Sequence, residues 1–318
     1  MFISCGDILV DLFNQPTDAA GKVALQGHVG GSPLNVAIGL ARLGNESGYL
    51  CKNSTDFIGQ KISAYMQFNG LRMEWVVPST LNSTLAMVRT NDDGSANYTF
   101  YTDNTADVSM TIEDLPDSFP DNLEMLHFAS YSTAVGSTRG ALIALAERES
   151  GKRAISYDPN LRTSIEPDIQ IWQESFASFC AVADFVKASD EDIAALLGKG
   201  KSLDTFAADT LARGPGLVAV TEGSGGATLY AADGRQARSR PLDITVVDTV
   251  GAGDTFQAAS LHWLNANGCV NGGTVDVSNA DLHACVNFAA TAAAITCTRH
   301  GADLPTLSEV QSRLSGAS

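Results

Sequence analysis

A carboxylate directly follows a glycine-containing turn in VVDTVGAGDTFQAAS, residues 246–260. The pattern after Asp254 predicts a helix, so the turn lies at a helix N-terminus, which offers free N–H groups and partial positive charge. Glycines let such amides approach an anion closely, so the turn predicts a cradle for a phosphoryl group in transfer. The cradle consists of Val250, Gly251, Ala252 and Gly253.

Asp254, at the edge of this cradle, has two interpretations. As a general base, it would accept the proton of an alcohol that attacks the phosphorus. As a structural residue, it would only cap the helix, because Asp is a favoured N-cap residue. The turn alone does not decide between them. The chain has no GxxxxGK[ST] motif, and GSGGA after Glu222 is not a dinucleotide fingerprint at the first strand.

The second half of the chain alternates between strand and helix patterns. Strands are predicted at 125–130, 153–160, 184–189 and 216–223, and helices at 137–150, 169–181 and 191–197. Such alternation implies parallel strands in a doubly wound sheet with helices on both faces. Ligands of such sheets bind beyond the carboxyl ends of the strands.

The first third of the chain is richer in β patterns. A first strand is predicted over 2–10, with Asp11 just past it, and short strands are predicted over 12–29. Apolar residues at helical spacing then predict a helix that ends at Gly44. Two β-rich runs around Asn91–Gly94 predict a hairpin, which could form a small second sheet with the strands after residue 11.

The composition excludes several classes of protein. The 318 residues carry a formal net charge of −16, which argues against a nucleic-acid partner. No apolar run of about 18 residues predicts a membrane span, and the N-terminus lacks the features of a signal peptide. The six cysteines form no CxxC pair and the five histidines no HxxxH pair. We therefore expect buried thiols, a cytoplasmic protein and no structural zinc.

Two segments resemble the signatures of the PfkB (ribokinase-like) family of sugar kinases. DTVGAGDTF is similar to the second signature, and GGSPLNVAIGLARLG, residues 30–44, resembles the first. DPNLR, KASDEDIAALLG, VTEGSGGATLY and TRHGADLP also fall in the expected order. The resemblance implies a single three-layer α/β/α domain over 1–318, with a β-sheet lid from about 12–29 and 75–105. It also implies that Asp254 is the catalytic base, and that two subunits join through their lids as a homodimer.

The resemblance assigns a set of residues to the sugar. Asp11 would bind sugar hydroxyls, and the glycine pair would let the sugar lie against the backbone. Several of these side chains also have an interpretation without a function. Asp11 would then be a solvated residue at a strand end, Asn35 a residue on a helix face, and Arg89 and Tyr101 ordinary residues of the lid surface. The implied substrate-binding residues are Asp11, Gly30, Gly31, Asn35, Arg89, Tyr101, Asp158, Asn160 and Arg162.

The resemblance also implies sites for ATP and cations. Ser189 and Asp192 stand where relatives often have Asn-x-x-Glu, so Asp192 or Glu191 is expected to reach Mg²⁺ through water. A monovalent-cation loop, with K⁺ as the ion, would include Asp248, Val250 and Gly301. The implied nucleotide-binding residues are Lys187, Ser189, Thr221, Gly223, Gly226 and Ala290.

The resemblance implies transfer of a phosphoryl group from ATP to a primary hydroxyl, with D-fructose as the expected acceptor. Within the family, 2-keto-3-deoxygluconate kinase and ribokinase are the alternatives. Arg89 or Arg162 could hold the carboxylate of a sugar acid. A catalytically silent sugar- or nucleotide-binding protein is the alternative from another class, and its support is the altered Ser189/Asp192 pair. A doubly wound oxidoreductase would need a glycine fingerprint that CGDILVD lacks.

Overall fold

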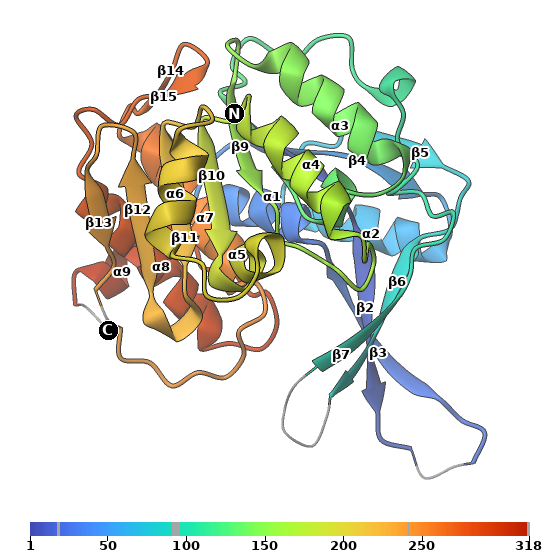
Figure 1. Ribbon diagram of the computed structural model, residues 1–318. Helices are drawn as coiled ribbons and strands as arrows, with labels where there is room; N and C mark the ends of the chain where they lie inside the picture. The colour runs from blue at the N-terminus through green and yellow to red at the C-terminus, as the bar shows by residue number, and fades with distance from the viewer. Residues whose placement is uncertain (18–19, 91–95, 241, 317–318) are drawn as a thin grey trace.

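A mixed, mostly parallel sheet forms the centre of the molecule (Figure 1). The computed structural model describes residues 1–17, 20–90, 96–240 and 242–316. The strand order is β13-β12-β11-β10-β9-β8-β1-β4-β5, and the β12 pairings with β11 and β13 are antiparallel. The strands are β1 (Phe2–Gly6), β4 (Ser47–Ser54), β5 (Val76–Ser79), β8 (Met125–Ala129), β9 (Ala154–Asp158), β10 (Phe185–Ser189), β11 (Leu217–Thr221), β12 (Ala227–Ala231) and β13 (Gln236–Arg238).

Helices cover both faces of this sheet, as the alternation of strands and helices predicts. One face packs against α1 (Ser32–Arg42), α2 (Phe57–Phe68), α7 (Ala252–Ala266), α8 (Leu282–Cys297) and α9 (Leu307–Leu314). The other face packs against α3 (Gly136–Glu149), α4 (Ile169–Cys180), α5 (Asp190–Leu197) and α6 (Leu203–Leu211). Strands buried on both sides need continuous apolar runs, and β1, β8 and β9 are buried along their whole length. The predicted three-layer α/β/α class is therefore confirmed.

A second, smaller sheet forms the lid, which projects from the body in Figure 1. Its order is β3-β2-β6-β7, with β2 and β6 parallel and the other pairs antiparallel. Its strands are β2 (Leu9–Gln15), β3 (Ala24–Gly30), β6 (Thr84–Thr90) and β7 (Ala96–Tyr101). β6 and β7 form the predicted hairpin, and its turn at Asn91–Gly94 lies outside the described residues.

Two predicted boundaries were wrong. The strand predicted over 2–10 is two strands, because the chain leaves the main sheet at Asp7 and enters the lid at Leu9. Asp11 therefore lies within β2, not beyond a strand end. Within the predicted lid range 75–105, β5 pairs with β4 and so belongs to the main sheet.

The remaining described elements are short. They are the hairpin of β14 (Val270–Asn271) and β15 (Thr274–Val275), and the 3₁₀ turns η1 (Ile112–Asp114), η2 (Tyr131–Thr133) and η3 (Gly223–Gly225). None of the helices in the described ranges is long and apolar enough to cross a bilayer.

Candidate active site

The glycine turn before α7 forms an N-terminal cradle. Gly251 is the N-cap, with φ 79°, and a Cβ there would lie 2.6 Å from the Cβ of Ala302. Only glycine accepts this backbone without strain or collision. The amide of Ala252 donates to the carbonyl of Thr249, and that of Val250 to Asp248. In the described residues, the amides of Gly251, Gly253 and Asp254 have no acceptor, so these amides are free to bind an anion.

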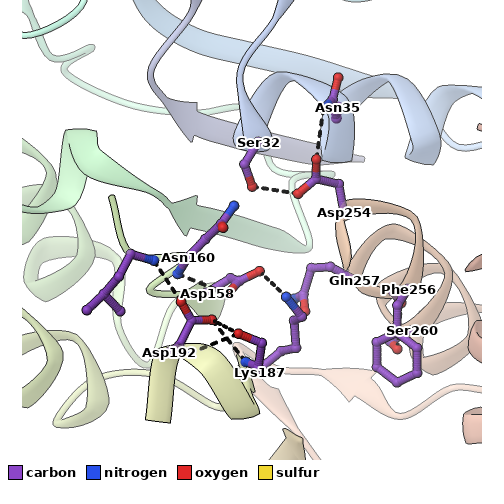
Figure 2. A network of polar contacts seen from close by, with 12 residues as sticks. Ser32, Asn35, Asp158, Asn160, Lys187, Asp192, Asp254, Phe256, Gln257 and Ser260 are labelled. Carbon is purple, nitrogen blue, oxygen red and sulfur yellow. Dashed lines mark hydrogen bonds and ion pairs between the residues drawn. The ribbon is translucent and has the colours of Figure 1, made fainter. Parts of the chain in front are cut away.

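Asp254 lies inside the first turn of α7 and is 8% exposed. The interpretation as a plain N-cap was wrong, because Gly251 holds that position. Ser32 Oγ donates to Asp254 Oδ1 at 2.6 Å, and Asn35 Nδ2 donates to Asp254 Oδ2 at 2.8 Å (Figure 2). Asn35, which is expected to bind the sugar, donates to the carboxylate in this conformation. These two residues of α1 orient an acceptor-only group at the mouth of the cradle.

A buried ion pair lies beside this turn. Lys187 Nζ on β10 is 2.7 Å from Asp158 Oδ2 at the end of β9, and the two side chains are 4% and 1% exposed. A Cβ on Gly253 would lie 3.1 Å from Lys187 Nζ, so the ammonium packs directly against the cradle. Burial lowers the pKa of Lys187, but the carboxylates of Asp158, Asp192 and Asp254 outweigh it and raise the pKa overall. Lys187 therefore carries a positive charge next to the free amides.

Asp192 has a structural role in this conformation. Its Oδ1 accepts the Leu161 amide at 2.8 Å, and its Oδ2 accepts the amide and hydroxyl of Ser189 at 3.0 and 2.7 Å. Ser189 in turn caps α5 through the Asp192 amide, which completes a capping box. Both oxygens of Asp192 are thus occupied, whereas Glu191 is exposed. These three hydrogen bonds favour contact of Asp192 with a metal through water over direct coordination.

On the lid side, the carboxylate of Asp11 lies within electrostatic reach of the guanidinium of Arg162. Burial raises the pKa of Asp11 to about 6, and the positive charge of Arg162 opposes this shift. Arg162 donates to the carbonyls of Asn160 and Leu161 and has no carboxylate partner in the described residues. A Cβ on Gly30 would lie 2.7 Å from Asp11 Oδ2, so this glycine makes room for the carboxylate itself.

The other residues expected near the sugar lie close to these groups. Gly31, with φ 120°, is the N-cap of α1, and a Cβ there would lie 2.6 Å from the carbonyl oxygen of Asp7. Asn160 has a positive φ of 34°, and its amide donates to Asp158 Oδ1 at 3.2 Å. Figure 2 shows its side chain pointing toward Ser32. The segment after β9 thus joins the ion pair to the mouth of the cradle.

Arg89 and Tyr101 lie on the opposite face of the lid from Asp11. Asp11 on β2 pairs with Ala86 on β6, and Ala86 pairs with Phe100 on β7. Tyr101, the next residue of β7, pairs with Leu85. Side chains alternate between faces along a strand, so Arg89 and Tyr101 share the outer face. Tyr98 shares the face of Asp11. Burial and the charge of Asp11 raise the pKa of Tyr98, which places this phenol near the carboxylate.

The residues expected to bind the nucleotide lie at the carboxyl ends of the last parallel strands. Thr221 ends β11, and the turn after it has positive φ at Gly223 and Gly226. A Cβ on Gly226 would lie 2.6 Å from Ser239 Oγ, so this turn is closely packed. Ala290 is half-buried on α8, which packs against β12 and β13.

The residues of the expected cation loop come together around one carboxylate. Asp248 accepts the amide of Val250 at 3.0 Å through Oδ1 and the amide of Gly301 at 2.8 Å through Oδ2. These bonds join the turn before α7 to the segment after α8. Across the described ranges, no group of three or more His, Cys, Asp or Glu side chains is placed to hold a metal ion.

Sequence reasoning missed several residues of the site. Ser32 lies inside the GGSP segment, and Tyr98 could have been found from the alternation of the lid strands. Gln257 lies one turn after Asp254, and its Nε2 donates to Ser156 Oγ on β9 at 2.6 Å. No local pattern signals Gln257, because its partner is 101 residues away.

An anion cradle, a neighbouring ammonium and an oriented carboxylate define a site for phosphoryl transfer to an alcohol. The comparisons agree with this class. Residues 6–309 match the model described as "pfkB family carbohydrate kinase". The chain therefore belongs to the pfkB family of carbohydrate kinases.

Known proteins add the following similarities. A fructokinase of Rhizobium leguminosarum bv. trifolii is 34% identical over 261 residues, which are 82% of this chain and 78% of that protein. The structure of a Xylella fastidiosa fructokinase with bound ATP matches with a TM-score of 0.90 at 23% identity, over 99% and 98% of the two chains. A Vibrio cholerae O395 fructokinase, bound to fructose, ADP and calcium ion, matches with a TM-score of 0.81 at 25% identity, over 98% and 97%.

Proposed function

We propose that this carbohydrate kinase is a fructokinase, which transfers the γ-phosphoryl group of ATP to the primary hydroxyl of D-fructose to give fructose 6-phosphate. The observation that carries the chemistry is Asp254, held by Ser32 and Asn35 at the mouth of a cradle of free amides. The similarity to fructokinases at about one-third identity supports the choice of sugar.

In the proposed reaction, Asp254 accepts the proton of the primary hydroxyl as the hydroxyl oxygen bonds to the γ-phosphorus. The bond from that phosphorus to the bridging oxygen breaks, and its electron pair leaves with ADP. The amides of Gly251 and Gly253 and the ammonium of Lys187 stabilise negative charge on the transferred group. Asp11 and the glycine pair orient the sugar, with Asn160, Arg162 and Tyr98 around it.

Thr221, Gly223, Gly226 and Ala290 are proposed to line the ATP site. Mg²⁺, when bound with the phosphates, neutralises their charge. Glu191, which is exposed, is proposed to meet its water shell, because the oxygens of Asp192 already accept hydrogen bonds within the fold. The Asp248 loop, with Val250 and Gly301, is proposed to respond to K⁺.

The first experiment measures ADP formation from ATP and Mg²⁺ with fructose, ribose, 2-keto-3-deoxygluconate or adenosine. We expect turnover with fructose and a loss of kcat of about 10²–10⁴-fold in Asp254→Asn. The second candidate substrate is the sugar acid 2-keto-3-deoxygluconate. Arg162 could bind its carboxylate, because this cation has no carboxylate partner in the described residues. Turnover with the acid alone would replace fructose, and no turnover with any sugar would favour a silent binder.

We also propose that two subunits associate through the outer faces of their lids. Tyr101 and Leu25 share that face and are 59% and 39% exposed. In the proposed dimer, the lid of the partner would cover these side chains. Sedimentation velocity should give a dimer for the wild type and a monomer for Tyr101→Asp. A wild-type monomer at micromolar concentration would contradict this proposal.

A further inference from the structure

Two carboxyl groups without a role in the proposed reaction are buried where the lid joins the body. Asp7 and Asp107 are 1% and 2% exposed. Asp7 lies between β1 and β2, and Asp107 follows β7. The chain also crosses between body and lid after β3 and before β6. At the first crossing, Gly31 packs against the carbonyl of Asp7, and at the second, Thr84 donates to Asp107.

Three hydroxyl groups of the protein donate hydrogen bonds to Asp107. Tyr131 donates to Asp107 Oδ2 at 2.6 Å, Thr105 donates to Asp107 Oδ1 at 2.9 Å, and Thr84 also donates to Oδ1. Thr84 and Thr105 belong to the lid strands and their ends, whereas Tyr131 belongs to the body. Burial raises the pKa of Asp107, but the three hydroxyl donors oppose this shift, so Asp107 keeps its charge more readily than a carboxyl group without donors.

The carboxyl group of Asp7 has fewer hydrogen-bond donors than that of Asp107. Its Oδ1 accepts one long hydrogen bond of 3.3 Å from the amide of Ser132, and its buried Oδ2 has no partner. Its carbonyl oxygen accepts the Tyr49 hydroxyl and packs against Gly31. A buried oxygen without a donor favours the neutral acid. Burial and then the charge of Asp107 raise the pKa of Asp7 to about 7.

The surroundings of the pair supply little compensating charge. Burial raises the pKa values of the tyrosines and thiols, which therefore stay neutral, and Arg162 opposes the shift of Asp7 less than Asp107 promotes it. The titratable and charged groups around Asp7 and Asp107 are Arg162, Tyr49, Tyr131, Cys5 and Cys51. Ser130, just before Tyr131 and Ser132, has φ 68° and ψ −163°, so the adjoining backbone is strained.

We propose that Asp7 and Asp107 are positioning residues for the sugar: the pair holds one proton, on Asp7, and thereby keeps the lid and Asp11 in place. Asp11 follows Asp7 by four residues, so a shift of this joint moves the carboxylate that faces the sugar. Ionisation of Asp7 would place two like charges in a buried joint and loosen it. The proposal rests on the proposed function, since the KM for the sugar reports the position of Asp11.

The test compares the KM for fructose and kcat between pH 6 and 9 in the wild type and Asp7→Asn. One ionisation changes KM by at most about tenfold per pH unit, so we expect a wild-type rise of about tenfold from pH 7 to 8.5, with a smaller change in kcat. Asp7→Asn keeps the joint neutral and should flatten the rise. Asp11 itself gains charge as pH rises, which favours sugar binding, so its titration acts in the opposite direction.

Asp184→Asn is the matched control. Burial also raises the pKa of Asp184, but this residue precedes β10, at the amino edge of the sheet far from the joint. It should keep the wild-type profile. Asp107→Asn removes the repelling charge and should also flatten the rise, which provides a second variant if Asp7→Asn does not fold. A wild-type KM that does not rise, or an equal rise in Asp7→Asn, overturns the proposal.

Hydrogen exchange tests the joint without any substrate. After correction for intrinsic rates, the amides of β6 should exchange faster at pH 8.5 than at pH 7 in the wild type, but not in Asp7→Asn. If β6 is equally protected at both pH values in the wild type, ionisation of Asp7 does not loosen the lid, and the proposal fails even if the protein is an active kinase. A protein that phosphorylates no sugar but shows the exchange difference would instead refute only the proposed function.

Discussion

At the residue scale, the site depends on groups that hold Asp254 in place. Ser32 and Asn35 each donate to one oxygen of this carboxylate, so both oxygens are oriented before any substrate binds. Preorganisation of this kind matters because a small displacement of a catalytic group can cost a large part of the rate. Gln257, one turn further along α7, attaches the same helix to β9.

Ser32→Ala should lower kcat about tenfold and lower the melting temperature by a few degrees at most. The substitution removes one donor to a charged acceptor, and such a bond contributes about 1.5–3 kcal/mol. Ser260→Ala is the control, because Ser260 is also buried but, in the described part of the chain, bonds only to the carbonyl of Phe256 within α7. Steady-state kinetics that give the same kcat for both variants would contradict the role of Ser32.

Gln257→Met should reduce kcat several-fold without loss of stability. Gln257 is fully buried, and its Oε1 has no partner, which costs about 1–3 kcal/mol. An apolar side chain of similar size removes that cost, but it also removes the bond to Ser156 that fixes the first turns of α7. The melting temperature should therefore stay the same or rise, while kcat falls. A less stable variant with unchanged kcat would show that Gln257 serves only the fold.

At the element scale, the loops at the carboxyl edge are held by side chains that the family resemblance assigns to ligands. Asp192 is the clearest example, because its bonds join the start of α5 to the loop after β9. Gly30 is another, since its lack of a side chain lets β2 and β3 place Asp11 against the backbone. The same residue can thus support the fold and the site.

Asp192→Ala should destabilise the protein by about 2–3 kcal/mol, because it leaves the Leu161 and Ser189 donors without their acceptor. Asp190→Ala is the control, since Asp190 is exposed in the same turn and accepts only the amide of Glu191. Urea unfolding would measure both. If Asp192→Ala instead keeps its stability and raises the Mg²⁺ requirement, Asp192 acts on the metal.

Gly30→Ala should raise the KM for the sugar about tenfold. The new Cβ would lie 2.7 Å from Asp11 Oδ2, so the carboxylate must move. Gly140→Ala on α3 is the control, because a Cβ there meets nothing within 4 Å and alanine favours a helix by about 0.5–1 kcal/mol. Gly140→Ala should be slightly more stable and equally active. An unchanged KM in Gly30→Ala would show that Asp11 does not bind the sugar.

At the scale of the whole molecule, lid and body are separate sheets joined at a buried acidic pair. The unfolded chain releases the proton of Asp7 near its ordinary pKa of 3.8, whereas the folded protein keeps it up to about pH 7. The folded state therefore loses stability relative to the unfolded state as pH rises from about 4 to 7, and the loss stays constant above that range.

Asp7→Asn should consequently be more stable than the wild type at pH 8, by about 2–4 kcal/mol, and the difference should shrink toward zero near pH 4. Asp184→Asn should gain less, because Asp184 is only partly buried and accepts hydrogen bonds that the amide would disturb. Urea unfolding at pH 5, 6.5 and 8 measures the trend. A constant difference between wild type and Asp7→Asn across this range would show that Asp7 does not hold a proton.

The sequence by itself determined the layered fold, the lid hairpin and the principal carboxylate. Local patterns suffice for the sheet and the hairpin, because burial on both faces requires apolar strands. The glycine turn located Asp254 at a helix N-terminus, and the resemblance of two motifs to the family signatures assigned it the role of base. The division of the strand predicted over 2–10 could not be predicted, since an unbroken apolar run does not show where a chain changes sheets.

Only the tertiary structure decided which residues meet. Asn35 contacts Asp254 across 219 residues. Asp192 completes the capping box of α5 and also binds the Leu161 amide. The lid register turns Arg89 and Tyr101 away from Asp11. The pairing of Asp7 with Asp107 likewise has no signature in either neighbourhood. A local pattern records the tendency of a segment, but the distance between two side chains depends on how every element between them packs.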